Sequence, residues 1–306
     1  MINLDKYSGC FSGLARGDTH GAFFEGGQLE RLLWKVIGRT KTGKLRYTDD
    51  TQMAIDVATS FIKNNRIDQN HLATVFAKSY KWSRGYGRSA TRLLKKIKTG
   101  VSWKDVNRAT FSDGSYGNGA AMRAPVLAMC FPDNQKDLAD NVAKCSEITH
   151  AHPLAIEGAK LIAFVTGAAL HDWETTIILN ALPAWCNEEI YKTKIAFCSK
   201  AMLVADPFPD SIIKKELGNG IAASESTQTA IYFALTCRSG NFQSMLDRIC
   251  AMGGDTDTIG AMAGAIWGAF NGSSAMDSRQ IERIENSETI ITLAQQLQGM
   301  AYTDYS

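Results

Sequence analysis

Apolar residues recur every three or four positions along most of the chain, which is the period of a helix with one buried face. The segment from Asp50 to Phe61 is typical, because Met53, Ala54, Val57, Ala58 and Phe61 would all lie on the same face. The same spacing predicts further helices at 70–82, 88–98, 135–148, 153–171, 223–238 and 258–270. The alternation expected of strands is scarce, so the pattern predicts an all-α protein.

Clusters of glycine and polar residues separate these helices, at 85–87, 112–119, 206–220 and 252–254. Such loops are where a ligand would meet the backbone. The chain has no internal repeat, low-complexity tract or long linker. Length alone would allow two domains, but two related acidic turns lie near opposite ends of the chain. We therefore expect a single compact domain over residues 1–306.

The two acidic turns are Tyr47-Thr48-Asp49-Asp50-Thr51 and Gly254-Asp255-Thr256-Asp257-Thr258, and each opens a helical pattern. Asp and Thr offer hard oxygen ligands, which suit Mg²⁺ or Mn²⁺ better than zinc or copper. If the turns converge, their four carboxylates need cations between them. The turns therefore predict a site for two metal ions. The alternative is that each turn only caps a helix, because Asp and Thr satisfy the free amides at a helix start.

The predicted helix at 258–270 is unusually rich in small residues, among them Gly260, Gly264 and Gly268. Each internal glycine destabilises a helix, so close packing against another helix or a ligand must offset that loss. We expect a central helix whose N-terminus carries Asp255, Asp257 and Thr258 to a cavity. Tight packing alone would explain the small residues but not the acidic turn.

Two glycine-rich loops are candidates for holding a phosphate. Gly114-Ser115-Tyr116-Gly117-Asn118-Gly119 precedes a helical pattern, and consecutive amides in such a turn can bind an anion. Leu217-Gly218-Asn219-Gly220-Ile221 has the same character. Both also fit plain turns, which favour Gly and Asn. Tyr86, between two glycines, could stack on a base or sugar or could complete the core. His150 could contact a ligand or serve only as a structural residue at a helix entrance.

Composition excludes several classes of protein. Apolar residues make up 45% and charged residues 21% of the chain, and the formal net charge is +2. These values do not fit a disordered chain or a strongly basic nucleic-acid binder. The basic residues of 92–98 fit the solvated face of an amphipathic helix. The longest apolar stretch, 259–270, is too short to span a membrane.

Seven cysteines, an odd number without CxxC spacing, indicate neither a disulfide framework nor a zinc site. The N-terminus has no signal-peptide pattern. We expect a cytoplasmic monomer with reduced thiols and with no nucleic-acid or membrane partner.

Taken together, these motifs resemble the ADP-ribosylglycohydrolase family almost end to end. The resemblance rests on the segments 9–18 (GCFSGLARGD) and 253–259 (GGDTDTI) and on the small-residue helix that follows. Three further segments resemble the serine-ADP-ribose hydrolase branch of that family: 84–87 (RGYG), 114–123 with GSYGNG and AMR, and 216–226 (ELGNGIAASES). The regions between Gly26 and Tyr47 and from 172 to 215 look unlike that branch, which leaves the size of the acceptor opening undetermined.

The resemblance implies an all-α orthogonal helical bundle around two Mg²⁺ ions, with Mn²⁺ as the alternative metal. It places Thr48, Asp49, Asp50, Asp255, Asp257 and Thr258 in the ligand positions and Glu25 at a mobile acidic position over the site. It also assigns a substrate role to loop residues and their neighbours. These are Ser115, Tyr116, Gly117 and Asn118 on the diphosphate and ribose loop, His150 at a ligand contact, and Ile221 near the adenine. Gly114, Gly119 and Tyr86 are further substrate-binding candidates, from the glycine-rich turns themselves.

The implied reaction is hydrolysis at the anomeric carbon of ADP-ribose, through an oxocarbenium-like state that needs an activated water. Glu25 is the first candidate for moving a proton or positioning the scissile bond, and Asp50 is the second. Apolar neighbours and flanking glycines suit Glu25 to this role, whereas the alternative is a loop carboxylate in solvent.

Three functions compete. The leading one is a metal-dependent hydrolase for O-linked ADP-ribose, on serine, as O-acetyl-ADP-ribose or in poly(ADP-ribose). The second removes ADP-ribose from arginine, in regulation or in toxin immunity. The third is a crystallin-like or ADP-ribose-binding protein without turnover, and the intact metal positions and Glu25 count against it.

Overall fold

A computed structural model describes residues 2–204 and 207–303, and it is helical throughout. No strand forms among these residues, and only isolated β-bridges occur, so the predicted all-α class is confirmed. The α-helices are α1 (Leu4–Gly21), α2 (Gln28–Ile37), α3 (Asp49–Asn64), α4 (Gln69–Ser79), α5 (Arg88–Lys98), α6 (Trp103–Val106), α7 (Ala124–Cys130), α8 (Gln135–Glu147), α9 (Pro153–Leu170), α10 (Thr175–Ala181), α11 (Glu189–Leu203), α12 (Asp210–Leu217), α13 (Ala223–Thr236), α14 (Phe242–Met252), α15 (Thr256–Asn271), α16 (Ser278–Glu282) and α17 (Ser287–Thr303). Short 3₁₀ turns lie at Trp82–Arg84, Asn118–Ala120, Leu182–Trp185 and Ser273–Ala275.

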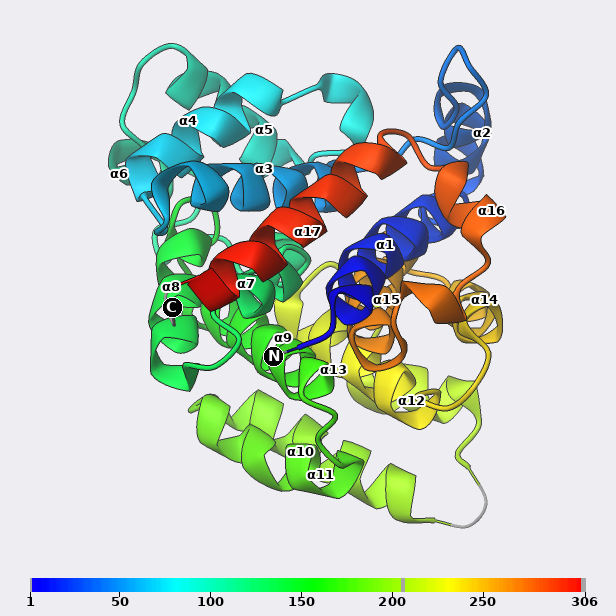
Figure 1. Cartoon of the computed structure of the whole chain (residues 1–306). Helices are drawn as coiled ribbons and strands as arrows, with labels where there is room; N and C mark the ends of the chain where they lie inside the picture. Colours follow the sequence, from blue (N-terminus) through cyan, green and yellow to red (C-terminus); the bar gives the residue numbers. More distant parts are fainter. Residues whose placement is uncertain (1, 205–206, 304–306) are drawn as a thin grey trace.

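The helices α1 and α15 form the centre of the molecule (Figure 1). Helices α9 and α13 pack against α15, and α17 crosses α1 near α3. Helices α3, α4 and α5 lie together on one side of this centre, and α10 and α11 lie on the other. Ile2 and Tyr302 are hydrogen-bonded, so the two ends of the described chain lie side by side.

A stripe of glycines brings the backbones of α1 and α15 into direct contact. The two helices run antiparallel, and a Cβ atom added to any glycine of the α1 stripe would overlap a backbone carbonyl of α15. The facing pairs are Gly9 with Gly268, Gly13 with Gly264, Gly17 with Gly260, and Gly21 with Thr256. The expected close approach to the small-residue helix is confirmed, and its partner is α1.

The sequence pattern missed α1 because this helix has no amphipathic stripe. Fourteen of its eighteen residues are buried, polar and apolar alike, so polarity does not vary around the helix. Helix α12 was also missed, because 206–220 was predicted to be a loop. Ile213 and Leu217 of α12 are buried one turn apart, although lysines lie between them. Residue 206 lies outside the described residues.

Helix α9 is long and apolar enough to cross a membrane, since its eighteen residues have a mean hydropathy of 1.4. However, 78% of it is buried within the protein, against α7, α8, α13 and α15. This burial is typical of a core helix. The predicted amphipathic face of α5 is also observed, because Leu93 and Leu94 are buried while Arg92, Lys95, Lys96 and Lys98 are exposed.

The glycine contact generates a stability prediction. Gly17→Ala places a methyl group against the Gly260 carbonyl, and backbone atoms on both sides cannot move aside cheaply. We expect the free energy of unfolding to fall by about 3 kcal/mol, the upper end of overpacking effects. The urea unfolding midpoint, followed by circular dichroism, measures the change.

Gly299→Ala is the matched control, because Gly299 is exposed on α17 and nothing lies near its added Cβ. That variant should be neutral or slightly more stable, since alanine favours a helix. Equal midpoints for the two variants would contradict the proposed role of the stripe.

Candidate active site

The two acidic turns converge at the starts of α3 and α15. Thr48 is the residue before α3, and Asp255 is the residue before α15. The Thr258 hydroxyl donates a hydrogen bond to Asp50 Oδ1 at 3.3 Å, across 208 positions of sequence. Thr48, Asp50, Asp255, Asp257 and Thr258 are all at least 94% buried. The predicted convergence is therefore observed.

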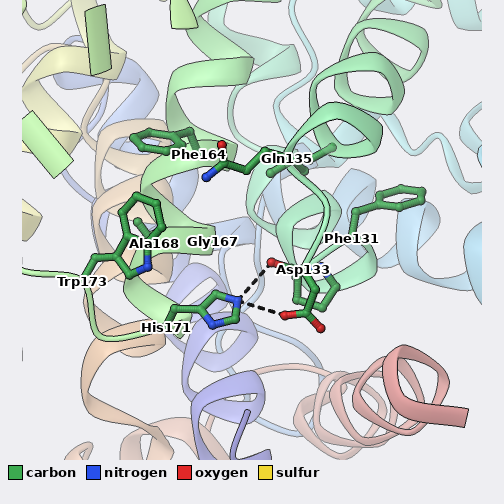
Figure 2. A pocket seen from close by; sticks show the side chains of 10 residues that line it. Phe131, Asp133, Gln135, Phe164, Gly167, Ala168, His171 and Trp173 are labelled. Atoms are coloured by element: carbon green, nitrogen blue, oxygen red, sulfur yellow. Dashed lines mark hydrogen bonds and ion pairs between the residues drawn. The ribbon is translucent and has the colours of Figure 1, made fainter. Parts of the chain in front are cut away.

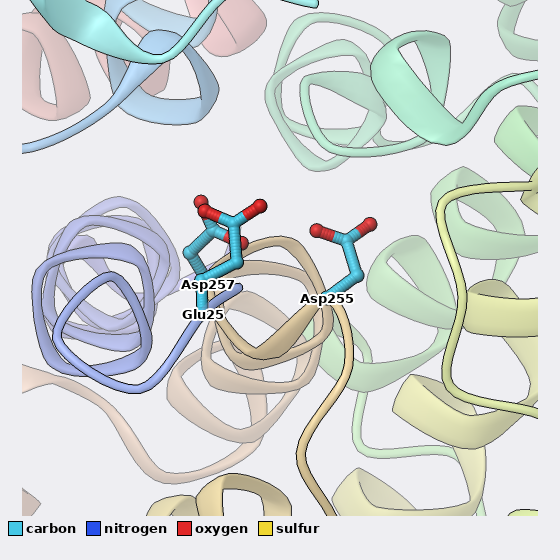
Figure 3. A group of neighbouring side chains, drawn as sticks. All are labelled: Glu25, Asp255 and Asp257. Atoms are coloured by element: carbon cyan, nitrogen blue, oxygen red, sulfur yellow. The ribbon is translucent and has the colours of Figure 1, made fainter. Parts of the chain in front are cut away.

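Glu25 lies with the acidic turn of α15. Carboxylate oxygens of Glu25, Asp255 and Asp257 lie within 4.8 Å of one another, and all three side chains point to the same side (Figure 3). Glu25 comes just after α1, where its amide donates to the Gly21 carbonyl at 3.1 Å. Since Gly21 lies against Thr256, the glycine stripe places Glu25 beside α15. The alternative of a loop carboxylate surrounded by solvent does not fit this position.

Helix capping accounts for only part of the acidic turns. The Thr48 side chain does cap α3, because its oxygen accepts from the Asp50 amide at 3.3 Å. Asp255, in contrast, makes no capping hydrogen bond to α15. Its carboxylate instead accepts from the Asn118 side-chain amide at 2.5 Å. The alternative that both turns are only caps is therefore inconsistent with α15.

Asp18, which received no role from the sequence, holds the first turn in place. Its buried carboxylate accepts hydrogen bonds from the Thr48 amide at 3.0 Å, the Thr51 amide at 3.1 Å and the Thr51 hydroxyl at 2.5 Å. Asp18 lies in α1 beside Gly17, so α1 contacts α15 through one face and fixes the start of α3 through another. The place of Asp18 at the end of the 9–18 segment, which carries the family resemblance, is a sequence signal that could have indicated a role.

Burial and mutual repulsion raise the pKa values of the clustered carboxyl groups. Loss of solvation is the largest cause for Asp49, Asp50 and Asp257, and nearby carboxylates add to it. The pKa of Asp255 is also raised by burial, although hydrogen bonds oppose the shift. So many carboxylates cannot all remain ionised in this volume without cations.

The residues of the cluster fit hard divalent cations. Asp50 Oδ2 is buried and has no hydrogen-bond partner among the described residues. The surrounding donors are carboxylate and hydroxyl oxygens, the ligands that Mg²⁺ and Mn²⁺ prefer. An orphaned buried carboxylate oxygen is costly, and a cation would satisfy it. The arrangement thus supports a metal site at the N-terminal ends of α3 and α15.

The glycine loop at 114–119 is tied to this cluster through Asn118. The Asn118 amide donates to the Ile221 carbonyl at 3.0 Å, and its side chain bridges Ser226 and Asp255. Gly114 has a left-handed φ of 88° and packs against the 151–152 backbone. The two glycine-rich loops predicted from the sequence thus meet beside the acidic residues.

His150 lies directly under the glycine loop. A Cβ atom on Gly119 would overlap its ring, while Gly117 lies at ordinary contact distance. Burial, together with the neighbouring Arg123, lowers the pKa of His150 to about 3, so the imidazole is neutral. Its Nδ1 lies 2.7 Å from the Thr149 hydroxyl, which leaves Nε2 facing the loop.

Arg123 is a second residue whose role was not predicted. It is fully buried and donates hydrogen bonds to the Gly119 carbonyl at 2.6 Å, the Thr149 hydroxyl at 2.9 Å and the Cys145 carbonyl at 2.9 Å. Arg123 therefore fixes the loop relative to His150. Its sequence signals were a lone arginine within an apolar run and its place in the AMR segment of the resemblance.

The exposed rim of the loop is partly aromatic. Tyr116 is 49% exposed, and its ring lies 5.9 Å from His152. Ile221 is 71% exposed on the neighbouring segment. The Ser115 hydroxyl accepts from the Gly117 amide at 3.3 Å and so shapes the turn between them. Tyr116 and Ile221 therefore present exposed apolar surface next to the glycine loop.

The stacking role suggested for Tyr86 does not fit the structure. Tyr86 is only 8% exposed, and its ring packs at 5.0 Å from that of Tyr80 within the hydrophobic core. The adjacent Gly85 lies close to Asp49, so this loop covers one side of the acidic cluster. Because glycines flank Tyr86 on both sides, the sequence pattern gave no sign that its ring is buried.

A separate pocket of about 210 Å³ lies at the far end of α9 (Figure 2). Its walls include Phe164 and Trp173, and His171 Nε2 donates to the Pro132 carbonyl at 3.0 Å. Eighteen helical residues span about 27 Å, and the opposite end of α9 borders the glycine loop. This pocket is therefore distant from the acidic cluster and is not part of the candidate site.

Comparison with known proteins agrees with this arrangement. A sequence model described as ADP-ribosylglycohydrolase matches residues 2–306. The chain is 31% identical to ADP-ribosylhydrolase ARH3 of Homo sapiens, over 96% of this chain and 93% of that protein. It is 32% identical to ADP-ribosylhydrolase ARH3 of Danio rerio, over 89% and 84%. A solved structure titled ADP-ribosylglycohydrolase-related protein complex has the same fold, with a TM-score of 0.71 and 22% identity over 97% of this chain and 98% of that chain.

The family match covers nearly the whole chain and includes both acidic turns, Glu25 and the glycine loop. The chain therefore belongs to the ADP-ribosylglycohydrolase family and is a hydrolase that cleaves the glycosidic bond of ADP-ribosylated substrates.

Proposed function

We propose that this protein removes O-linked ADP-ribose, from serine, from an acetyl ester or from a polymer, with two bound Mg²⁺ ions that Mn²⁺ can replace. The observation that carries the proposal is the meeting of Glu25 and the turns of α3 and α15 in one buried acidic volume. Thr48, Asp49, Asp50, Asp255, Asp257 and Thr258 would hold the metals. A bound pair supplies Lewis-acid stabilisation and lowers the pKa of water.

The glycine loop would bind the diphosphate. Arg123 and His150 hold the turn from Ser115 to Gly119 from beneath. The Gly117 and Asn118 amides already donate to Ser115 and Ile221, so the other amides of the turn would bind the anion. His150 stays neutral and can donate one hydrogen bond without adding charge. Tyr116 and Ile221 offer exposed apolar surface for the adenosine portion.

Glu25 would move a proton or position the scissile bond, with Asp50 as the second candidate. Glu25 lies at the edge of the cluster and is half-buried, and glycines at 26 and 27 follow it. Gly26 has a left-handed φ of 70°, a turn that permits the segment to swing. Asp50 lies deeper and is hydrogen-bonded to Thr258, so its position is more rigid.

The first prediction concerns metal and stability. At a Mg²⁺ concentration about one hundred times Kd, each bound ion should stabilise the native protein by about 2.7 kcal/mol. Asp257→Asn should lose this gain and turnover together, because a neutral amide cannot replace a carboxylate ligand. Without metal, the variant should be at least as stable as the native protein, since one repelling charge is gone.

Thermal unfolding with and without Mg²⁺, alongside ADP-ribose release, measures both effects. Asp140→Asn is the control, because Asp140 is exposed on α8. Full activity after exhaustive chelation would refute metal dependence.

The second prediction concerns Glu25. Glu25→Gln should retain ADP-ribose binding but lower kcat by about a hundredfold or more, as expected when a general acid or base is lost. Glu282→Gln, at an exposed position on α16, should behave like the native enzyme. Single-turnover kinetics separates chemistry from binding, and normal turnover by the Glu25→Gln enzyme would remove Glu25 from the mechanism.

The third prediction concerns the linkage. A guanidine leaving group calls for a carboxylate clamp, whereas an alkoxide needs a proton donor or metal. Serine-linked ADP-ribose or O-acetyl-ADP-ribose should be hydrolysed at least tenfold faster than arginine-linked ADP-ribose, a difference of about 1.4 kcal/mol in barrier. Peptides identical except for the modified residue provide the comparison. Equal or faster cleavage of the arginine linkage would reverse the assignment.

A further inference from the structure

A second pocket, of about 340 Å³, lies where α1, α16 and the loop after α2 meet. In Figure 1, α2 and α16 lie at the upper right, and α1 extends towards them from the centre of the molecule. The walls include Arg16 and His20 of α1, Arg39 after α2, and Arg283 after α16. Phe23 and Phe24 close one side. No residue that lines the pocket has a carboxylate.

The guanidinium groups of this pocket lack anionic partners. Among the described residues, no carboxylate lies within 4.0 Å of Arg16, Arg39 or Arg283. Arg16 is 8% exposed, and it donates only to the neutral side chains of Gln280 at 3.0 Å and Gln243 at 2.8 Å. A buried cation usually has an ionic partner. Asp247 is the carboxylate that acts on Arg16 from a distance, and it pairs with His20 at 3.0 Å rather than with a guanidinium group. Arg39 and Arg283 have no anionic partner within 4.0 Å among the described residues, so they remain able to bind an anionic ligand.

The surrounding chain reinforces this positive character. Residues 28–46 contain six lysines and arginines but only one carboxylate, at Glu30, although the whole chain has a formal charge of only +2. Arg39 and Leu45 of this segment line the pocket, so a segment with excess positive charge borders it. A concave surface with one sign of charge focuses the field on an oppositely charged ligand.

The apolar side of the pocket suits a flat ring. Phe24 is 40% exposed, and its ring lies 5.4 Å from that of His20. Phe23 packs edge-on against Trp34 at 6.5 Å, which steadies this wall. Aromatic faces and guanidinium planes both stack on planar groups. Arginine forks also match phosphate oxygens.

We propose that this pocket is a second binding site, for a free nucleoside phosphate, with phosphates on Arg16, Arg39 and Arg283 and the base against Phe23 and Phe24. It is separate from the acidic cluster, although Phe24 directly precedes Glu25. A ligand here would contact the segment that carries Glu25.

The test counts ADP sites by equilibrium dialysis with labelled ADP and the full-length protein. The native protein should bind two equivalents, one at the glycine loop and one at this pocket. Arg39→Ala with Arg283→Ala should weaken the second equivalent at least tenfold, since losing charge-assisted hydrogen bonds costs about 1.5 kcal/mol or more. Both side chains are exposed, so folding should persist.

Arg31→Ala with Lys35→Ala is the matched control, because it removes the same charge from exposed positions outside the pocket. It should retain both equivalents. Gly117→Val should lose only the ADP bound at the glycine loop and should keep the ADP bound at this pocket. Binding at this pocket can therefore be measured even if the proposed catalytic function is wrong.

Two unchanged equivalents in the Arg39/Arg283 variant would overturn the proposal, as would equal weakening in the control. Pyrophosphate binding to this site as tightly as ADP would refute the role of the base. Displacement of ADP from the site by an acidic peptide at lower concentration would instead identify a protein partner.

Discussion

The close contact between α1 and α15 is the constraint on which the site depends. Four glycines of α1 face Gly268, Gly264, Gly260 and Thr256, so the two backbones touch along their whole length. Glycine in a helix is unfavourable by about 1 kcal/mol relative to alanine, and the contact offsets that loss by packing. One consequence concerns the position of Glu25. The end of α1 is fixed beside the start of α15, where Gly21 touches Thr256 and Glu25 follows.

A second consequence is that α1 also sets the position of α3. Asp18 accepts three hydrogen bonds from Thr48 and Thr51 at the start of that helix. The acidic turns are thus held by one helix, although about two hundred residues separate them. Burial and, after it, mutual repulsion raise the pKa values of these carboxyl groups. A rigid frame around repelling ligands is the arrangement expected where a cation supplies the missing attraction.

Local features of the site were predictable from the sequence. Caps and glycine turns have short-range signatures, so the starts of α3 and α15 and the loop at 114–119 were located correctly. The period of apolar residues placed α3, α4, α5, α8, α9, α13 and α15. It was not recognised in α14 and α17, although their buried faces follow the same spacing. The contribution of Glu25 came from family resemblance, because nothing in its own neighbours reveals what it contacts.

Features that depend on distant contacts were not predictable. Helix α1 is buried on all sides, so it has no stripe, and Asp18 acts on residues about thirty positions away. Tyr86 looked mobile between two glycines but completes the core, and Arg123 fixes a loop through partners on other segments. In each case the partner is set by tertiary packing, which overrides local preference.

The most direct test of the account is anomalous diffraction from crystals grown with Mn²⁺. The central claim is that the turns of α3 and α15, with Glu25 beside them, form one site for divalent cations. The account predicts anomalous peaks within coordination distance of the carboxylates of both Asp50 and Asp257. A map without a peak between these residues at saturating Mn²⁺, or with peaks only elsewhere, would contradict it.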